Sequence, residues 1–106
     1  MDRIDRVSIV GMGAMGILYG DFFANALGRE QVTFLADSDR ARRYRNTPVY
    51  CNGRKMDFRI QDGAVPDSQG PAQLLLFAVK ATALGDAISV AGNQVGKDTV
   101  ILSVLN

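Results

Sequence analysis

The sequence has no histidine, no tryptophan and a single cysteine, Cys51, among its 106 residues. The absence of histidine removes the commonest acid–base side chain and the commonest metal ligand, so we expect no metal site in this segment. A lone cysteine excludes a disulfide within the chain. It is typical of a reducing compartment, for which the cytoplasm is the default.

Long apolar runs and an excess of charge of one sign are also missing. No apolar stretch approaches the ~20 residues that cross a bilayer, and the charged residues 1–6 are unlike a signal peptide. The formal net charge is only +1, which gives no electrostatic reason to expect nucleic acid or a membrane surface as a partner. The length and the 47% hydrophobic content indicate one globular domain over residues 1–106.

Apolar stretches of strand type alternate along the chain with stretches of helical spacing. The predicted strands are residues 7–10, 31–36, 73–79 and 99–105. The predicted helices are residues 14–27, capped by Gly28, and residues 84–95. Near-continuous apolar strands that alternate with helices are typical of a parallel sheet with right-handed crossovers. The fold class predicted is therefore α/β, a Rossmann-type, doubly wound and mostly parallel sheet.

The first predicted helix has a wide apolar stripe, which we expect to face the sheet. The stripe consists of Met15, Leu18, Tyr19, Phe22, Phe23, Ala26 and Leu27. The middle of the chain is more polar, and either Ser38 or Asp39 is placed to cap a short helix that ends before Pro48. Residues 49–51, the turn Asn52-Gly53 and residues 54–60 predict a small β-hairpin insertion, followed by a loop over residues 62–71.

The first strand runs directly into a glycine-rich loop of the pattern GxGxxG. The loop consists of Gly11, Met12, Gly13, Ala14, Met15 and Gly16. A glycine loop between a strand and a helix is the fingerprint of dinucleotide binding. Gly11 permits the tight turn, Gly13 lets the backbone approach a pyrophosphate, and Gly16 allows close packing of the helix. The alternative is a structural turn that binds nothing.

Asp37 closes the second strand, about 20 residues beyond the glycine loop, where an acid binds the ribose hydroxyls of NAD and repels the 2′-phosphate of NADP. The same carboxylate is also placed to act as a helix cap or a solvated loop side chain. Four arginines follow Asp37 and are either a solvated helix face or a source of ligands for a 2′-phosphate. They are Arg40, Arg42, Arg43 and Arg45.

Lys80 ends the apolar strand 73–79. A lysine at the carboxyl end of a parallel strand beside the glycine loop points into the ligand crevice, where it can pair with a cofactor phosphate, a ribose hydroxyl or a substrate carboxylate. On spacing alone, a lysine that extends to water explains the position equally well.

Taken together, these segments resemble the ketopantoate reductase (2-dehydropantoate 2-reductase) family. The resemblance covers nearly the whole chain and rests on VSIVGMGAMGILYG, VTFLAD, the Asn-Gly hairpin, LLLFAVKATAL and DTVILSVLN. It implies NADPH-dependent reduction of a 2-keto acid to a 2-hydroxy acid in pantothenate biosynthesis. Asp37 departs from the arginine that many members carry for the NADP phosphate, so the residues favour NAD where the family implies NADPH.

The resemblance also implies roles for single residues. Gly11, Gly13 and Gly16 match the cofactor loop, Lys80 matches a lysine of the cofactor and substrate crevice, and Asn106 matches a substrate-binding asparagine. The family's general-acid lysine and a substrate-binding glutamate belong to a helical second domain, which we expect to be absent from this chain. The chain alone is then expected to bind NAD(P)H without turnover.

Three other functions fit the same residues: a non-catalytic NAD(P)-sensing module, another hydroxyacid or imine dehydrogenase, and a folded remnant that binds nothing. We also expect a homodimer. The strand 99–105 has the composition of an interior strand, so without a neighbour it exposes a sheet edge and apolar surface through which the chain can self-associate. The hairpin is the alternative contact.

Overall fold

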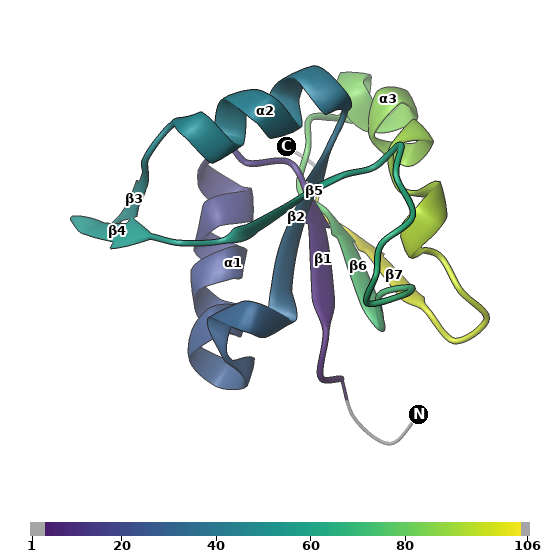
Figure 1. The fold of residues 1–106 in the computed structure, drawn as a ribbon, viewed down its shortest axis with the longest axis horizontal. Helices are drawn as coiled ribbons and strands as arrows, with labels where there is room; N and C mark the ends of the chain where they lie inside the picture. Colours follow the sequence, from purple (N-terminus) through teal and green to yellow (C-terminus); the bar gives the residue numbers. More distant parts are fainter. Residues whose placement is uncertain (1–3, 105–106) are drawn as a thin grey trace.

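The computed structural model describes residues 4–104, and Asn106 therefore lies outside the described part. Its main feature is a five-stranded sheet in the order β5-β2-β1-β6-β7, and every neighbouring pair in it is parallel (Figure 1). The strands are β1 (Val7–Val10), β2 (Val32–Ala36), β5 (Arg59–Asp62), β6 (Leu74–Phe77) and β7 (Val100–Ser103). The predicted Rossmann-type α/β fold is confirmed.

Helices cover both faces of this sheet. Alternate strand residues point to opposite faces, so Ile9, Phe34 and Leu76 share a cluster with α1 (Ala14–Leu27), while Val10, Leu35 and Leu75 share another with α3 (Leu84–Ser89). The helix α2 (Ser38–Asn46) lies at the carboxyl ends of β2 and β5 (Figure 1). No helix within residues 4–104 is long and apolar enough to cross a membrane.

The predicted hairpin forms, but it is shorter than expected. β3 (Val49–Cys51) and β4 (Arg54–Met56) pair antiparallel around Asn52 and Gly53, which both have positive φ, as a tight hairpin turn requires. The prediction of one strand over residues 54–60 was wrong. The chain breaks at Phe58, whose ring packs 4.7 Å from that of Phe34, and β5 then joins the main sheet parallel to β2.

The prediction of a single helix over residues 84–95 was also wrong. The segment consists of α3 and the 3₁₀ turn η3 (Gly92–Gln94), and another 3₁₀ turn, η2 (Ala81–Ala83), precedes α3. Gly92 is a poor helix former, and the buried Gln94 side chain accepts a hydrogen bond from the Ser8 hydroxyl and donates one to the Asp67 carboxylate. The remaining 3₁₀ turn, η1 (Arg29–Gln31), takes up Gln31, which had been assigned to β2.

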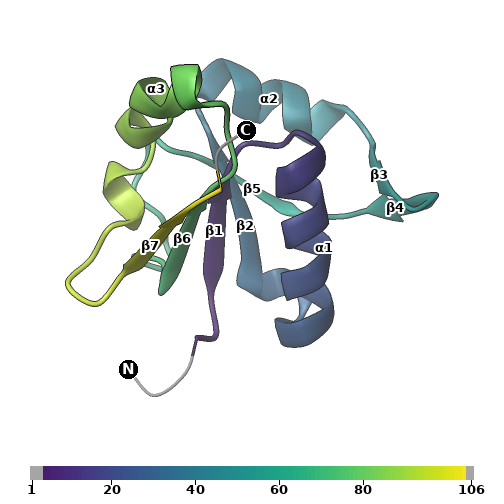
Figure 2. The same cartoon turned by 180° about the vertical axis from the view of Figure 1, so that it is seen from behind.

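One prediction of burial needs correction. In α1, the buried residues Gly16 and Gly20 lie against the sheet, while Leu18 and Phe22 are 54% and 63% exposed, so the predicted stripe is wider than the contact surface. The last strand, β7, lies at the edge of the sheet (Figure 2), and all four of its residues are exposed, as expected for this strand without a neighbour. The helix cap is Asp37 rather than Ser38 or Asp39, and the C-terminal cap at Gly28 is confirmed by its N–H bond to the Ala24 carbonyl.

Candidate functional site

The carboxyl ends of β1, β2 and β6 surround a cleft of about 780 Å³, which we call the carboxyl-edge cleft. Its walls include Gly11, Gly13, Ala14, Asp37 and Lys80, which come from three separate segments of the sequence. Ligands of open α/β sheets bind at this place, because the connections on the two sides of β1 diverge and leave a crevice.

The glycine loop is shaped by two close backbone contacts. Gly11 has φ +111°, and a Cβ atom there would lie 2.2 Å from the Ala78 carbonyl oxygen of the neighbouring strand end. A Cβ on Gly16 would lie 1.8 Å from the carbonyl oxygen of Gly11. Both positions therefore exclude any side chain. Gly13 differs, because a Cβ there would meet nothing within 4 Å, so the loop leaves open space beside it.

The first turn of α1 presents free backbone N–H groups to this open space. Its cap residue Gly13 makes no side-chain cap, and the first turn contains no acidic residue. The Gly13 carbonyl already accepts the Ile17 N–H at 2.9 Å, so the helix begins directly after the loop. Unpaired N–H groups and the positive end of the helix dipole make such a terminus suited to a phosphate.

Asp37 lies at the end of β2, where it caps α2 and also lines the cleft. Its Oδ1 accepts a hydrogen bond from the Arg40 backbone N–H at 2.8 Å, which caps α2. Its Oδ2 lies 3.3 Å from Nη1 of Arg40, and both side chains are about half exposed. The carboxylate therefore lines the cleft with lone pairs that remain accessible to a hydroxyl donor.

Among the four arginines of α2, only Arg40 lines the cleft. Arg42 pairs with Asp39 at 2.7 Å, and Arg45 donates to the Ile60 carbonyl at 3.2 Å. The interpretation of this cluster as a solvated helix face therefore holds for Arg42.

Lys80 follows β6 and caps η2 through its backbone, with its carbonyl accepting the Ala83 N–H at 2.9 Å. Its side chain is exposed and lines the cleft. Within residues 4–104, its ammonium has no ion-pair or hydrogen-bond partner. The lysine is therefore free to meet an anionic ligand from the β6 side.

Not every predicted site residue reaches the cleft. Gly16 is buried behind the loop, Met15 packs against the core, and Met12 lines a second, adjoining pocket. The cleft also contains Tyr44, Thr82 and Asp86, which the sequence reading did not single out. Thr82 lies in η2 and Asp86 in the first turn of α3, and no sequence motif marked either residue.

The strongest charge pair lies outside the cleft, where it fixes the loop before β6. Arg59 donates to both carboxylate oxygens of Asp67, at 2.6 and 2.9 Å, and the Asp67 side chain is only 2% exposed. These bonds hold the pKa of Asp67 far below its usual range. The pKa of Asp62 is also lowered, chiefly because the Ser38 hydroxyl donates to it at 2.6 Å.

This sheet order, with a glycine loop at the carboxyl edge of its central strand, defines a Rossmann-type domain. Within that class, the sequence profile of the family described as ketopantoate reductase PanE/ApbA matches residues 7–106. The chain belongs to this family, which confirms the resemblance seen in the sequence. A search of curated protein sequences finds no match.

Solved structures share the fold of this chain. The chain is 26% identical to 2-dehydropantoate 2-reductase from Geobacter metallireducens, with a TM-score of 0.68 over 95% of this chain and 34% of that chain. The dimeric ketopantoate reductase from Staphylococcus aureus is 19% identical, with a TM-score of 0.67 over 95% and 33% of the two chains. D-mandelate dehydrogenase with NADH and anilino(oxo)acetate is 20% identical, with a TM-score of 0.74 over 95% and 33%. The chain spans about a third of the length of these proteins.

Proposed function

We propose that this chain is the cofactor-binding domain of an NAD(P)H-dependent reductase that converts a 2-keto acid to the 2-hydroxy acid. The observation that carries the proposal is the convergence of the glycine loop, Asp37 and Lys80 on one cleft of about 780 Å³. Membership of the ketopantoate reductase family supports 2-dehydropantoate as the substrate. The alternative is a reductase that carries out the same chemistry but forms a different hydroxyacid.

The cleft fits a nicotinamide dinucleotide in charge and shape. The open space beside Gly13 and the uncapped first turn of α1 suit the pyrophosphate, which we place against the backbone N–H groups of Gly13 and Ala14. The Asp37 carboxylate suits the adenosine ribose hydroxyls. Gly11 and Gly16 serve by allowing the loop to close, whereas Met12 and Met15 flank it. When bound, the dinucleotide supplies the hydride.

We base the proposed cofactor preference on Asp37, whose carboxylate also pairs with Arg40. A carboxylate at the end of β2 repels a 2′-phosphate, so we propose that NADH binds more tightly than NADPH, against the preference that the family resemblance implies. The similarity in fold to D-mandelate dehydrogenase, which was solved with NADH, supports this choice.

Lys80 and Asn106 are the residues proposed to meet the substrate. The Lys80 ammonium, without a partner among the described residues, is suited to the carboxylate of a keto acid or to a cofactor oxygen. Asn106 lies outside the described residues, and its role rests on the resemblance. We propose that reduction also needs a proton donor from a helical second domain, so that these 106 residues alone bind the dinucleotide without turnover.

Mapping of the dinucleotide by nuclear magnetic resonance tests this proposal. Addition of NADH is expected to shift the backbone amide signals of Gly11, Gly13, Ala14, Asp37 and Lys80, and addition of 2-dehydropantoate to the NADH complex is expected to shift Lys80 further. Shifts with NADH that never respond to the keto acid would favour the non-catalytic sensing module. Absence of any shift with either dinucleotide would leave only a folded domain that binds nothing.

We further propose that the chain self-associates through β7. Val100, Ile101 and Leu102 are 45%, 51% and 52% exposed, and they lie on an edge strand that has no partner strand on one side among residues 4–104. An apolar, uncharged edge is a template for pairing with a second copy. The dimeric state of the enzyme from Staphylococcus aureus agrees with a homodimer, although it does not locate the contact.

A further inference from the structure

Two helices, α2 and α3, flank the carboxyl-edge cleft and lie beside each other at the carboxyl edge of the sheet (Figure 1, Figure 2). Arg40 and Tyr44 of α2 line the cleft, and so does Asp86 of α3. The chain between the two helices covers residues 47–83, so its connectivity does not set their spacing. Within residues 4–104, no hydrogen bond or ion pair joins α2 directly to α3. The spacing of the helices therefore depends on a third part of the chain.

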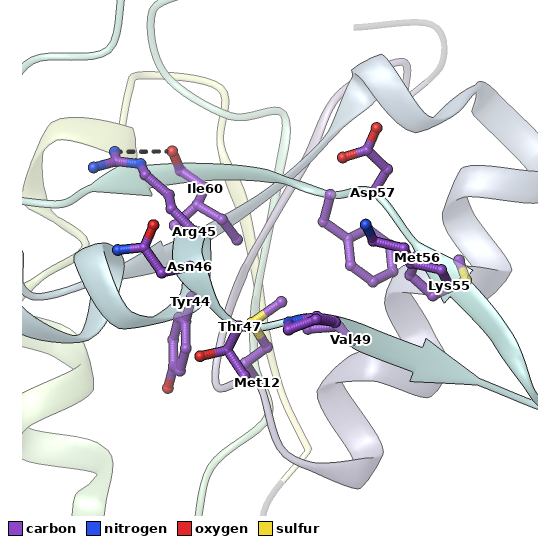
Figure 3. Close-up of a pocket in the computed structure, with 12 residues that line it drawn as sticks. Met12, Tyr44, Arg45, Asn46, Thr47, Val49, Lys55, Met56, Asp57 and Ile60 are labelled. Atoms are coloured by element: carbon purple, nitrogen blue, oxygen red, sulfur yellow. Dashed lines mark hydrogen bonds between the residues drawn. The ribbon is translucent and has the colours of Figure 1, made fainter.

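The helix α2 is bonded to β5 at both of its ends. At the N-terminal end, the Ser38 hydroxyl donates to Oδ2 of Asp62, the last residue of β5, at 2.6 Å. Ser38 directly follows Asp37, so this bond acts next to the carboxylate proposed for the ribose. At the other end of the helix, Arg45 donates to the Ile60 carbonyl at 3.2 Å (Figure 3). The position of α2 is therefore referred to β5.

The C-terminal end of α3 contacts the next residue of the chain, Gly63. Gly63 is buried, and a Cβ atom there would lie 2.1 Å from the carbonyl oxygen of Val90, which follows α3 and lines the cleft. The Gly63 carbonyl accepts a hydrogen bond from Nδ2 of Asn93 at 2.9 Å. Its N–H donates to the Ala36 carbonyl at the end of β2, also at 2.9 Å. Gly63 thus joins the end of β2 to the end of α3.

The short length of α3 makes these contacts important. The helix has only six residues, and so short a helix takes its position from the groups that surround it rather than from its own stability. Asp62, Gly63 and Asn93 hold both helices at one place, yet none of the three lines the cleft.

We propose that Asp62, Gly63 and Asn93 are positioning residues, which set the spacing of α2 and α3 around the adenosine half of the dinucleotide. The inference rests on the proposed function, because the ribose position at Asp37 places the adenosine half between these helices. When one of the contacts is lost, only the fraction of molecules with both helices at their present spacing binds the adenosine half. The apparent Kd then rises by the inverse of that fraction. The nicotinamide half extends towards Lys80 and is unaffected.

Nuclear magnetic resonance titrations of the 106-residue chain and of Asn93→Ala test this assignment. The ligands are NADH, AMP as its adenosine half, and reduced nicotinamide mononucleotide as its other half. In Asn93→Ala, NADH and AMP are each expected to bind about fivefold more weakly, as for the loss of one hydrogen bond, and the nicotinamide mononucleotide is expected to bind as in the parent chain. Equal weakening of both halves would indicate a general loosening of the domain and would overturn the proposal.

The control variant is Thr99→Val, which loses hydrogen bonds at the opposite edge of the sheet. The Thr99 hydroxyl donates to the Ala72 carbonyl at 2.7 Å and accepts the Gly96 N–H at 2.8 Å, just before β7 begins. Thr99→Val is expected to lose stability but to keep the parent affinity for all three ligands. Relaxation dispersion is expected to show exchange at Val90 in Asn93→Ala, suppressed by AMP and absent from Thr99→Val. AMP binding weakened equally in the two variants would contradict a positioning role.

Gly63→Ala is the stronger variant, because its Cβ meets the Val90 backbone and α3 must shift. It is expected to weaken AMP at least about tenfold. If it fails to fold, Asn93→Ala alone decides the question. A parent chain that binds neither NADH nor AMP would contradict the proposed function and, with it, this inference. A parent chain that binds both, with unchanged binding in Asn93→Ala, would contradict the positioning role alone.

Discussion

The carboxylate of Asp37 accepts hydrogen bonds from two different groups of the same residue, Arg40: the backbone N–H at 2.8 Å and the guanidinium at 3.3 Å. One side chain thus begins α2 and holds the only arginine of that helix that lines the cleft. Removal of the carboxylate is therefore expected to affect helix stability and cofactor choice separately. A neutral residue with a side-chain oxygen can still cap the helix, but it cannot repel a 2′-phosphate or hold Arg40.

Replacement of Asp37 by serine and by alanine separates these effects. Serine keeps the helix cap, so Asp37→Ser is expected to unfold at nearly the parent temperature, whereas Asp37→Ala is expected to lose about 1 kcal/mol of stability. Both variants are expected to bind NADH about tenfold more weakly and to favour NADPH, because the negative charge is gone and Arg40 is released. Calorimetric titration and thermal unfolding measure the two quantities. An unchanged NADH affinity in Asp37→Ser would show that the carboxylate is only a cap.

Two glycines of the same loop are expected to respond differently to alanine. In Gly16→Ala the new Cβ meets the Gly11 carbonyl at 1.8 Å, and the expected loss of stability is about 3 kcal/mol or more. In Gly13→Ala the new Cβ enters open space, so the domain is expected to stay folded while the pyrophosphate loses its approach. NADH affinity is then expected to fall at least about tenfold. A Gly13→Ala variant that binds NADH normally would move the pyrophosphate away from this loop.

The Arg59–Asp67 pair predicts a pH dependence of stability. Because the folded-state pKa of Asp67 is depressed, its contribution is complete above about pH 5 and is lost progressively as the pH falls from the unfolded value near 3.9 through the depressed folded-state value. Asp67→Asn is expected to cost about 3 kcal/mol at pH 7 and to flatten the acid limb of the stability curve. Urea unfolding between pH 2 and 7 measures both effects. The control Asp39→Asn breaks an exposed pair and is expected to change stability by less than about 1 kcal/mol. Curves that superimpose for Asp67→Asn and the parent chain would contradict the prediction.

Lys80 is expected to act on ligands and not on the fold. Its side chain is exposed and has no partner within residues 4–104, so Lys80→Met should unfold like the parent chain. The affinity of NADH, or that of the keto acid for the NADH complex, is expected to fall about tenfold. Lys97→Met, an exposed lysine outside the cleft, serves as the control. Equal binding of the ligands by both variants would show that the Lys80 side chain contacts only solvent.

The edge strand β7 predicts how the chain associates. Ile101→Lys places a charge on the exposed edge and is expected to shift the molar mass in light scattering from a dimer towards a monomer. Tyr50→Lys on the exposed hairpin tests the alternative contact and is expected to leave the dimer intact. If the parent chain stays monomeric at high concentration, self-association is excluded.

Much of the fold followed from the sequence because local patterns and long-range contacts agree. The apolar strand 7–10, the glycine loop and the Asn52-Gly53 turn each have one favourable conformation. The errors occurred where a distant contact decides the outcome. Phe58, at the strand break, packs against Phe34, and Gln94, beyond the end of α3, bonds to Ser8 and Asp67.

The candidate site was predicted less completely than the fold. Gly13, Asp37 and Lys80 were expected to share a crevice, and the structure brings them to one cleft. Tyr44 and Asp86 were missed, because helix spacing alone does not tell which polar side chain lines a cavity. The second pocket, which Met12 lines, was not predicted, since it exists only where α2, the β3–β4 hairpin and β5 meet.

Calorimetric titration of the 106-residue chain with NADH and NADPH tests the central claim most directly. We expect saturable binding of one dinucleotide per chain, tighter for NADH, and loss of that binding in the folded Gly13→Ala variant. A natively folded chain that gives no heat of binding with either dinucleotide would contradict the assignment of the carboxyl-edge cleft as a cofactor site.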